Sequence, residues 1–236
     1  AESQFLVFQH DRLVRVKRDY RWSNYFPYED GPFAGFYIET WSGGAHCCNT
    51  GFLFQTAPSL KQVQVLSFDD SQVVMETSKQ SKPTLKYWNI FANWRGAFAG
   101  SVSAKIILSI RKGRFVFDPN LTAKLHTTGT RSTQEPSDGT LKIMLGQLAL
   151  DDHLRGIPRN NMGRDWNQPL KLLARRLNTF IYSGKAQQGA AWLRSMWPKE
   201  KDLDSFLREY ISELREPKSW AGLLEANAGA ILGFTK

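Results

Sequence analysis

The residues best suited to chemistry in this sequence are His46, Cys47 and Cys48, which are adjacent and include both cysteines of the 236-residue chain. Imidazole and thiolate groups together suit a soft metal such as copper or zinc. Adjacent α-carbons lie about 3.8 Å apart, whereas disulfides usually join α-carbons roughly 4.4 to 6.8 Å apart. A Cys47–Cys48 bond would therefore be strained and easily reduced, so the motif also suits a redox-active pair of thiols.

The backbone around this motif decides which of its side chains can act together. In an extended strand only His46 and Cys48 would share a face, while a turn at the preceding Gly43-Gly44 would bring all three side chains together. No CxxC motif or second histidine–cysteine cluster completes a metal site. We therefore favour a structural role, in which a strained disulfide or two buried thiols fix a tight corner of a sheet, over metal binding or redox switching.

The charge distribution is compatible with an anionic partner. Lysine and arginine number 31 against 22 aspartate and glutamate residues, which gives a net charge of +9. Part of this charge gathers at Arg12, Arg15 and Arg18, where it would attract an anionic envelope polymer or a protein partner. A solvated strand face explains the same residues without a partner, and we favour this interpretation of the cluster. We do not expect nucleic acid, because the nearest match to an RNA-binding strand, residues 111–117, has Arg114 where that motif needs an aromatic residue.

Other catalytic motifs are missing from the sequence. It contains no GxSxG, no HExxH, no phosphate-binding glycine loop and no dinucleotide-binding fingerprint. Carboxylates do occur side by side at Asp69-Asp70 and Asp151-Asp152, but adjacent carboxylates in polar stretches usually belong to turns or helix caps. We therefore expect a binding module rather than an enzyme, with no cofactor other than the soft metal considered above.

Two halves with different patterns must position these residues. Residues 1–125 read as strands of an antiparallel sheet, blade-like as in a propeller or part of a sandwich, because apolar and polar side chains alternate. Lys112-Gly113 predicts the tight turn of a hairpin. Residues 126–164 are predicted to form a connecting loop region, and residues 165–236 a small helical region. The predicted fold class is therefore α+β.

Helical spacing of apolar residues carries the second half of this prediction. It predicts helices at 169–182, 185–197 and 203–214, the first of them ended by Gly184. Ser219 is expected to cap a fourth helix. In the first helix pair small residues face bulky ones, which is typical of a single helical-repeat unit, and one such unit cannot bury its own apolar face.

The sequence also indicates where the protein is found. No apolar run approaches the roughly 18 residues that a membrane-spanning helix needs. The sequence opens on Ala1-Glu2-Ser3-Gln4 rather than on methionine, as it would after cleavage behind a small-residue processing site. We expect a mature periplasmic or secreted protein without a transmembrane segment. The pattern predicts no particular oligomeric state.

A resemblance to known proteins agrees with this expectation. Residues 39–48, with Ser42-Gly43-Gly44-Ala45 before the histidine and cysteines, resemble the SGGAHCC signature of a group of largely uncharacterised secreted or periplasmic bacterial proteins. Residues 94–117 and 177–198 resemble later segments of the same proteins. Many of those proteins carry a calcium-type loop before the signature, but residues 28–33 lack its spaced Asp/Asn ligands, so we predict no calcium. The resemblance implies an extracytoplasmic protein and supplies no established activity.

These observations lead to one functional prediction and two alternatives. We predict an extracytoplasmic binding protein for an anionic envelope component or a protein partner. Redox or soft-metal chemistry at His46-Cys47-Cys48 is the first alternative, and inhibition of an envelope hydrolase is the second. The predicted binding residues are the His46-Cys47-Cys48 motif, one residue on each side of it in the sequence, and the basic cluster. They are Trp41, His46, Cys47, Cys48, Asn49, Arg12, Arg15 and Arg18.

Overall fold

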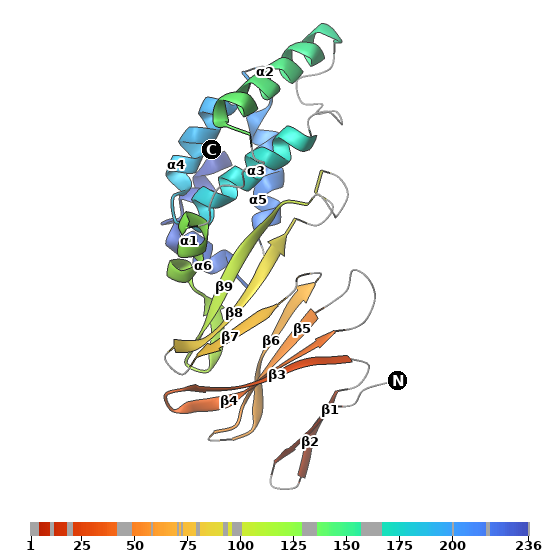
Figure 1. The fold of residues 1–236 in the computed structure, drawn as a ribbon, viewed down its shortest axis with the longest axis vertical. Coiled ribbons are helices and arrows are strands. Elements are labelled where there is room, and N and C mark those ends of the chain that lie inside the picture. Colours follow the sequence, from red (N-terminus) through yellow and green to blue (C-terminus); the bar gives the residue numbers. More distant parts are fainter. Residues whose placement is uncertain are drawn as a thin grey trace. The chain divides into compact units, whose positions relative to one another are not determined.

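The computed structural model describes residues 5–9, 12–17, 21–41, 49–57, 59–69, 71, 73–78, 81–91, 94–95, 101–128, 136–156, 167–199, 201–215 and 218–235. Two compact units divide the chain: a sheet unit from 1–88 and 106–117, and a helical unit from 89–105 and 118–236. The described residues form antiparallel sheets followed by helices (Figure 1), so the predicted α+β class is confirmed. None of the helices in this described part is both long and apolar enough to cross a lipid bilayer.

Ten strands are described, in three sheets. The first four-stranded sheet has the order β3-β4-β5-β6 and consists of β3 (Arg21–Asp30), β4 (Phe33–Trp41), β5 (Asn49–Gln55) and β6 (Lys61–Asp69). The second has the order β10-β9-β8-β7 and consists of β7 (Val74–Ser78), β8 (Ser81–Ile90), β9 (Ser103–Arg111) and β10 (Arg114–Phe117). A separate two-stranded sheet pairs β1 (Phe5–Gln9) with β2 (Arg12–Lys17).

Aromatic side chains fill the core of the sheet unit. Phe36 and Phe54 stack on neighbouring strands with ring centroids 5.0 Å apart. Tyr37 meets Phe115 of the other sheet edge to face at 5.7 Å. Gly51 leaves the room that Tyr37 needs, because a Cβ at this glycine would lie 2.4 Å from the tyrosine ring. Burial, with a smaller effect from the charge of Glu39, raises the pKa of the Tyr37 hydroxyl well above its ordinary value.

The two large sheets are also joined at their edges. β6 and β10 are edge strands, whose backbone groups lack a neighbouring strand on one side. The side-chain amide of Gln64 on β6 donates to the carbonyl of Phe115 and accepts from its N–H, both at 2.8 Å. One side chain therefore satisfies both backbone groups of the Phe115 position, as a paired strand would.

The predicted hairpin at Lys112-Gly113 is confirmed. Arg111 pairs with Arg114, and Lys112 and Gly113 both have positive φ, 51° and 68°, as the primed turns of two-residue hairpins require. The carboxylate of Asp30, at the end of β3, accepts from the backbone N–H of Gly113 at 3.3 Å and pairs with the ammonium of Lys82 at 2.5 Å. Asp30, which lies in the segment without a calcium-type ligand pattern, thus binds a turn of its own chain.

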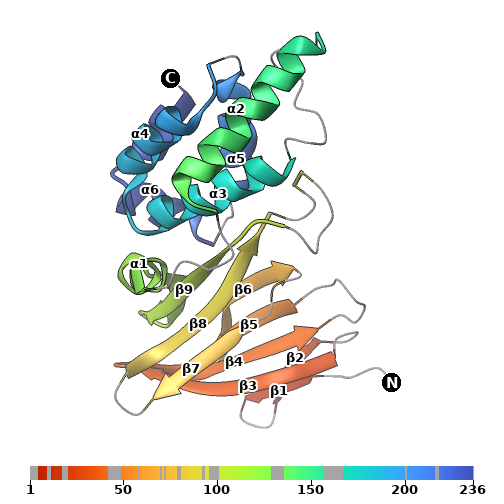
Figure 2. The ribbon, with the colours of Figure 1, turned by 45° about the horizontal axis from the view of Figure 1, so that its top comes forward.

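The helical unit contains six α-helices among its described residues, and Figure 2 shows α2 beside α3 and α4. Their bounds are α1 (Pro119–Thr128), α2 (Asp138–Leu154), α3 (Asn167–Tyr182), α4 (Ala186–Met196), α5 (Leu203–Leu214) and α6 (Trp220–Ala226), followed by a 3-10 helix, η3 (Ala230–Thr235). Helices α3, α4 and α5 were predicted from their spacing. The strand pattern expected up to residue 125 and the loop region expected at 126–164 differ from the structure, which has α1 and α2 there.

Local signals explain where these helices begin and end. The carboxylate of Asp118 accepts from the N–H of Leu121 at 2.9 Å, as an N-cap does, so the helix begins directly after the last strand. Gly184, with φ of +73°, ends α3 as predicted. Ser219 precedes α6, but its hydroxyl makes no capping hydrogen bond to that helix. Gly189 allows close contact of α4 with α3, since a Cβ there would lie 2.8 Å from the Cβ of Phe180.

Candidate functional site

The structure describes only part of the predicted site. His46, Cys47, Cys48 and Arg18 lie outside the described residues, so metal binding, redox switching and corner fixing stay predictions. Trp41 and Asn49 are described and are paired as the last residue of β4 and the first of β5. Asn49 donates its side-chain N–H to the carbonyl of Ser71 at 2.9 Å, which ties the start of β5 to the segment that precedes β7.

The basic cluster is likewise described only in part. Arg12 and Arg15 belong to β2, where their backbones pair with Gln9 and Val7 of β1. Their proposed contact with an anionic partner stays a prediction. In the described part of the chain, no group of three or more histidine, cysteine, aspartate or glutamate residues is arranged to hold a metal ion.

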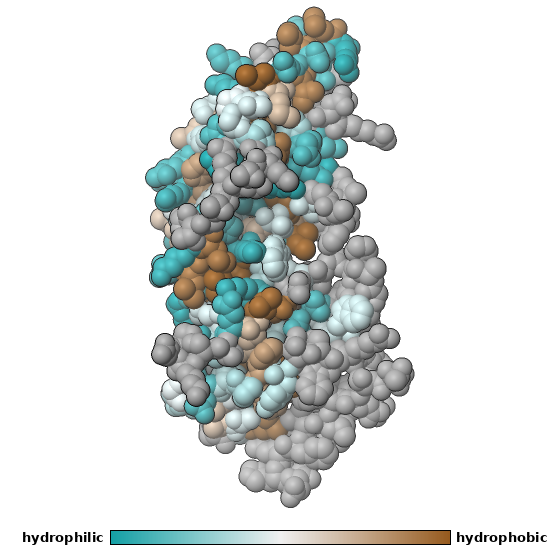
Figure 3. Space-filling view, viewed as in Figure 1, coloured by the Kyte–Doolittle hydropathy of each residue, from teal (hydrophilic) through white to brown (hydrophobic). Residues whose placement is uncertain are grey.

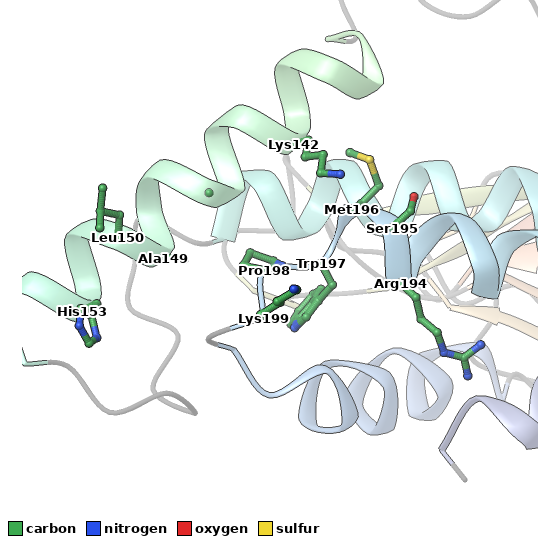
Figure 4. A pocket seen from close by; sticks show the side chains of 11 residues that line it. Lys142, Ala149, Leu150, His153, Arg194, Ser195, Met196, Trp197, Pro198 and Lys199 are labelled. Carbon is green, nitrogen blue, oxygen red and sulfur yellow. The ribbon is translucent and has the colours of Figure 1, made fainter.

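A groove in the helical unit brings together side chains that sequence reasoning did not combine. It encloses ≈ 650 Å³ between α2 and the end of α4 with the residues that follow it. Figure 4 shows the side chains that form its two walls. Lys142, Gly146, Ala149, Leu150 and His153 come from α2, and Arg194, Ser195, Met196, Trp197, Pro198 and Lys199 come from the other side.

The lining combines positive charge with apolar surface. Lys142, Arg194 and Lys199 contribute ammonium and guanidinium groups, and none of the described lining residues is an aspartate or glutamate. Their side chains are exposed, and among the described residues no carboxylate pairs with them. The apolar part includes Leu150 of α2 and the indole of Trp197. The groove therefore suits a ligand with both negative charge and apolar surface.

A buried ion pair holds the two walls together. The ammonium of Lys201 lies 2.6 Å from the carboxylate of Asp152 on α2, and both side chains are buried. The indole N–H of Trp197 donates to the backbone carbonyl of Lys201 at 3.1 Å. The Trp197 ring also packs against Phe206 of α5 with centroids 5.0 Å apart. Trp197 is thus held in place in the groove wall by a hydrogen bond and by ring packing.

Helix α2 supplies one whole wall, and sequence reasoning placed no helix there. Its inner face buries Leu141, Leu145 and Ala149, but apolar residues also occupy its other faces, so the sequence lacks the one-sided pattern of α3 and α5. A signal was present at its start, where the Ser137 hydroxyl accepts from the N–H of Thr140 at 3.1 Å. The interpretation of Asp152 as a turn or capping residue is wrong, because it lies within this helix and pairs with Lys201.

Comparisons with known proteins return no match: no family model fits this sequence, and neither a curated protein nor a solved structure matches it. The fold and the groove therefore define the protein only as a class, an α+β protein with a basic, partly apolar groove in its helical unit. The resemblance of residues 39–48, 94–117 and 177–198 to secreted bacterial proteins remains a proposal based on the sequence.

Proposed function

We propose that this chain is an extracytoplasmic binding protein and that its helical unit holds an anionic partner in the groove between α2 and residues 194–199. The observation that carries this proposal is the lining itself, in which three cations without a described carboxylate partner line the same groove as the exposed apolar side chain of Leu150. The location outside the cytoplasm rests on the resemblance of residues 39–48.

The physical properties of the groove support binding. Its volume of ≈ 650 Å³ falls within the roughly 300 to 1,000 Å³ of most ligand pockets. Apolar contact would come chiefly from Leu150, which is 58% exposed whereas Trp197 is only 9% exposed, and burial of apolar surface is worth roughly 25 cal/mol per Å². The cations would supply orientation and selection against positively charged ligands. The net charge of +9 would raise the association rate at low salt.

A small anionic probe tests this proposal. We expect anilinonaphthalene sulfonate, which joins a sulfonate to an apolar ring system, to bind the native protein with a rise in its fluorescence. Lys142→Glu with Lys199→Glu should weaken that binding by about tenfold or more, equivalent to about 1.4 kcal/mol. The measurement is a fluorescence titration at low and at physiological salt.

A control pair separates the groove from the general charge of the protein. Lys61→Glu with Lys185→Glu makes the same change in net charge at exposed lysines that do not line the groove. This pair should leave probe binding within about twofold of wild type, because distant exposed charges are screened at physiological salt. Equal weakening by both pairs, or no binding by the native protein, would contradict the proposed groove.

The earlier alternatives concern other parts of the chain. Redox or soft-metal chemistry at His46-Cys47-Cys48 is independent of the groove and stays a prediction for residues outside the described ones. An inhibitor of an envelope hydrolase would be one form of the binding protein proposed here, with the hydrolase as its partner.

A further inference from the structure

Helix α2 has a second apolar face, which is exposed in the described part of the structure. Ile143, Leu150 and Leu154 are 61%, 58% and 75% exposed, whereas Leu141 and Leu145 on the opposite side are buried. Figure 3 shows hydrophobic side chains at the surface in the part of the view where α2 lies. A helix that is apolar on several sides is normally buried, so this exposed stripe is typical of a helix that packs against a further partner.

The spacing of the stripe fits a second helix. Residues 143, 147, 150 and 154 follow each other in steps of four, three and four, which is the spacing of the seam between two packed helices. Gln147 is the one polar residue of this seam, a position where coiled coils often carry a polar side chain that fixes the register. From Ile143 to Leu154 the stripe is about 16 Å long, at about 1.5 Å per helical residue.

Gly146 leaves room for close approach. It lies in the middle of α2, is exposed and lines the groove, and a Cβ at this position would meet no atom within 4 Å. Glycine inside a helix is less favourable than alanine, and the described residues give no steric reason for it here. Its position on the groove side of the stripe would let the backbone of another helix approach α2 closely.

Charge selects the kind of helix. With 3.6 residues per turn, Lys142 and His153 lie on the groove side of the stripe, and Asp151 lies on its other side. Across the groove are Arg194 and Lys199. A partner helix in this position would face positive charge along the groove and a single described carboxylate, Asp151, on its outer edge. Acidic side chains on its groove side are therefore the complementary ones.

We propose that the groove and the stripe together bind an acidic amphipathic helix of another protein. This inference rests on the proposed function and names its partner class. The helix lies along α2 over Gly146, places apolar side chains against the exposed Ile143 and Leu150, and directs acidic side chains to Lys142 and Lys199. A second copy of this chain would bring the same cations against each other, and a flat lipid surface would not enter the recess beside Gly146.

A peptide selection tests this proposal without a known partner. Random peptides of about 16 residues, enough for four helical turns, are selected on the full-length protein. A protein carrying Ile143→Ser and Leu154→Ser serves for counter-selection, since both residues belong to the stripe but do not line the groove. We expect enriched peptides with apolar residues at helical spacing and an excess of aspartate and glutamate. The best of them should gain helical circular dichroism on binding.

Variants then measure each part of the site. The stripe variant, which carries Ile143→Ser and Leu154→Ser, should bind the best peptide about tenfold more weakly than wild type. It should bind anilinonaphthalene sulfonate within about twofold of wild type, because its groove lining is intact. Gly146→Gln should weaken peptide binding, yet raise or preserve the thermal midpoint, because glutamine is the better helix former. A weaker binder that is at least as stable as wild type cannot be explained by damage to the fold.

Each other result overturns the inference. If the protein binds the sulfonate but enriches no peptides, or enriches basic or non-helical ones, the proposed function stands and the helical partner is wrong. If it binds neither probe, the proposed function fails as well. Binding of phosphatidylglycerol vesicles that the stripe variant abolishes, with peptides no better than their scrambled forms, would assign the stripe to a lipid surface. A dimer in solution that the stripe variant dissociates would assign it to a second copy.

Discussion

Two buried aspartates, one in each unit, form ion pairs with very different surroundings. Asp30 of the sheet unit pairs with Lys82, whose side chain is 64% exposed, and also accepts backbone N–H bonds from the β9–β10 turn. Asp152 of the helical unit pairs with Lys201, whose side chain is only 2% exposed. The Asp30 carboxylate therefore binds backbone groups of a turn and a lysine that remains in water. The Asp152 carboxylate binds a lysine that is as buried as the aspartate itself.

This difference indicates which of the two ion pairs contributes more to the free energy of unfolding. Removal of one member of a buried pair leaves the other charge without water and without a partner, and such losses cost several kcal/mol. A lysine in water loses little when its partner is removed, and exposed pairs contribute roughly 0 to 1 kcal/mol. We therefore expect the same type of contact to have unequal effects in the two units.

The largest effect is expected for Asp152→Ala. The substitution leaves the ammonium of Lys201 buried and unpaired, so the free energy of unfolding should fall by about 3 to 5 kcal/mol. Urea unfolding followed by far-ultraviolet circular dichroism, which reports the helices, measures it. The double change Asp152→Leu with Lys201→Met removes both charges and should restore most of the loss. A single variant as stable as wild type would show that the pair is not the link between the groove walls.

A smaller effect is expected for Asp30→Ala. It removes charge-assisted hydrogen bonds to Lys82 and to the backbone of the Lys112-Gly113 turn, and hydrogen bonds to charged groups contribute about 1.5 to 3 kcal/mol each. Because water can reach Lys82, the total loss of unfolding free energy should stay near this range and be smaller than the sum of the separate hydrogen bonds. Chemical unfolding monitored by tryptophan fluorescence measures it.

The acid dependence of stability provides the control for Asp30. The pKa of the Asp30 carboxyl lies below its ordinary value. The hydrogen bond from the Lys82 ammonium lowers this pKa most, burial opposes it, and the N–H groups of the turn lower it further. Its contribution is therefore complete above the unfolded pKa of about 3.9 and is lost as the pH falls through the lower folded pKa. Asp30→Ala should remove this part of the acid dependence. An unchanged acid profile would mean that Asp30 is not ionised in the folded protein.

The smallest effect is expected for Lys82→Ala. The exposed lysine should contribute no more than about 1 kcal/mol at neutral pH, even though it is the largest influence on the pKa of Asp30. The informative change is in acid, where the variant should lose less stability than wild type and complete that loss at a higher pH, because the folded pKa of Asp30 moves back towards its ordinary value. A loss at neutral pH as large as that of Asp152→Ala would remove the contrast between the two units.

The fold was predictable where one physical cause determined a segment. Helices α3 and α5 have one apolar face each, and the β9–β10 hairpin needs positive φ at its two turn residues, which Gly113 accommodates readily. Helix α2 was not predictable in this way, because its apolar residues serve both the inner core and the exposed stripe, and together they hide the helical period. The segment after β10 was predicted as strand because the change to helix is abrupt. β10 ends at Phe117, and the cap at Asp118 starts a helix at the next residue.

The groove could not be predicted from spacing. Its walls come from α2 and from residues 194–199, which are far apart in the sequence, and what joins them is the Asp152–Lys201 pair. A carboxylate and a lysine at such a separation carry no pattern that distinguishes a buried pair from two surface charges. The His46-Cys47-Cys48 motif illustrates the opposite case, since its residue types are distinctive in the sequence and its geometry lies outside the described residues.

The path of the chain between the two units has a consequence for how the protein is made. Residues 89–105 belong to the helical unit, where Phe91 and Trp94 pack against Tyr210 and Phe206 of α5. During synthesis these aromatic side chains leave the ribosome long before α5 does. Strands β9 and β10 are made between them and the helices. Neither unit is therefore one continuous fragment. A truncated chain that starts at residue 118 would expose the aromatic face of α5, and one that stops at residue 88 would lack two strands of its second sheet.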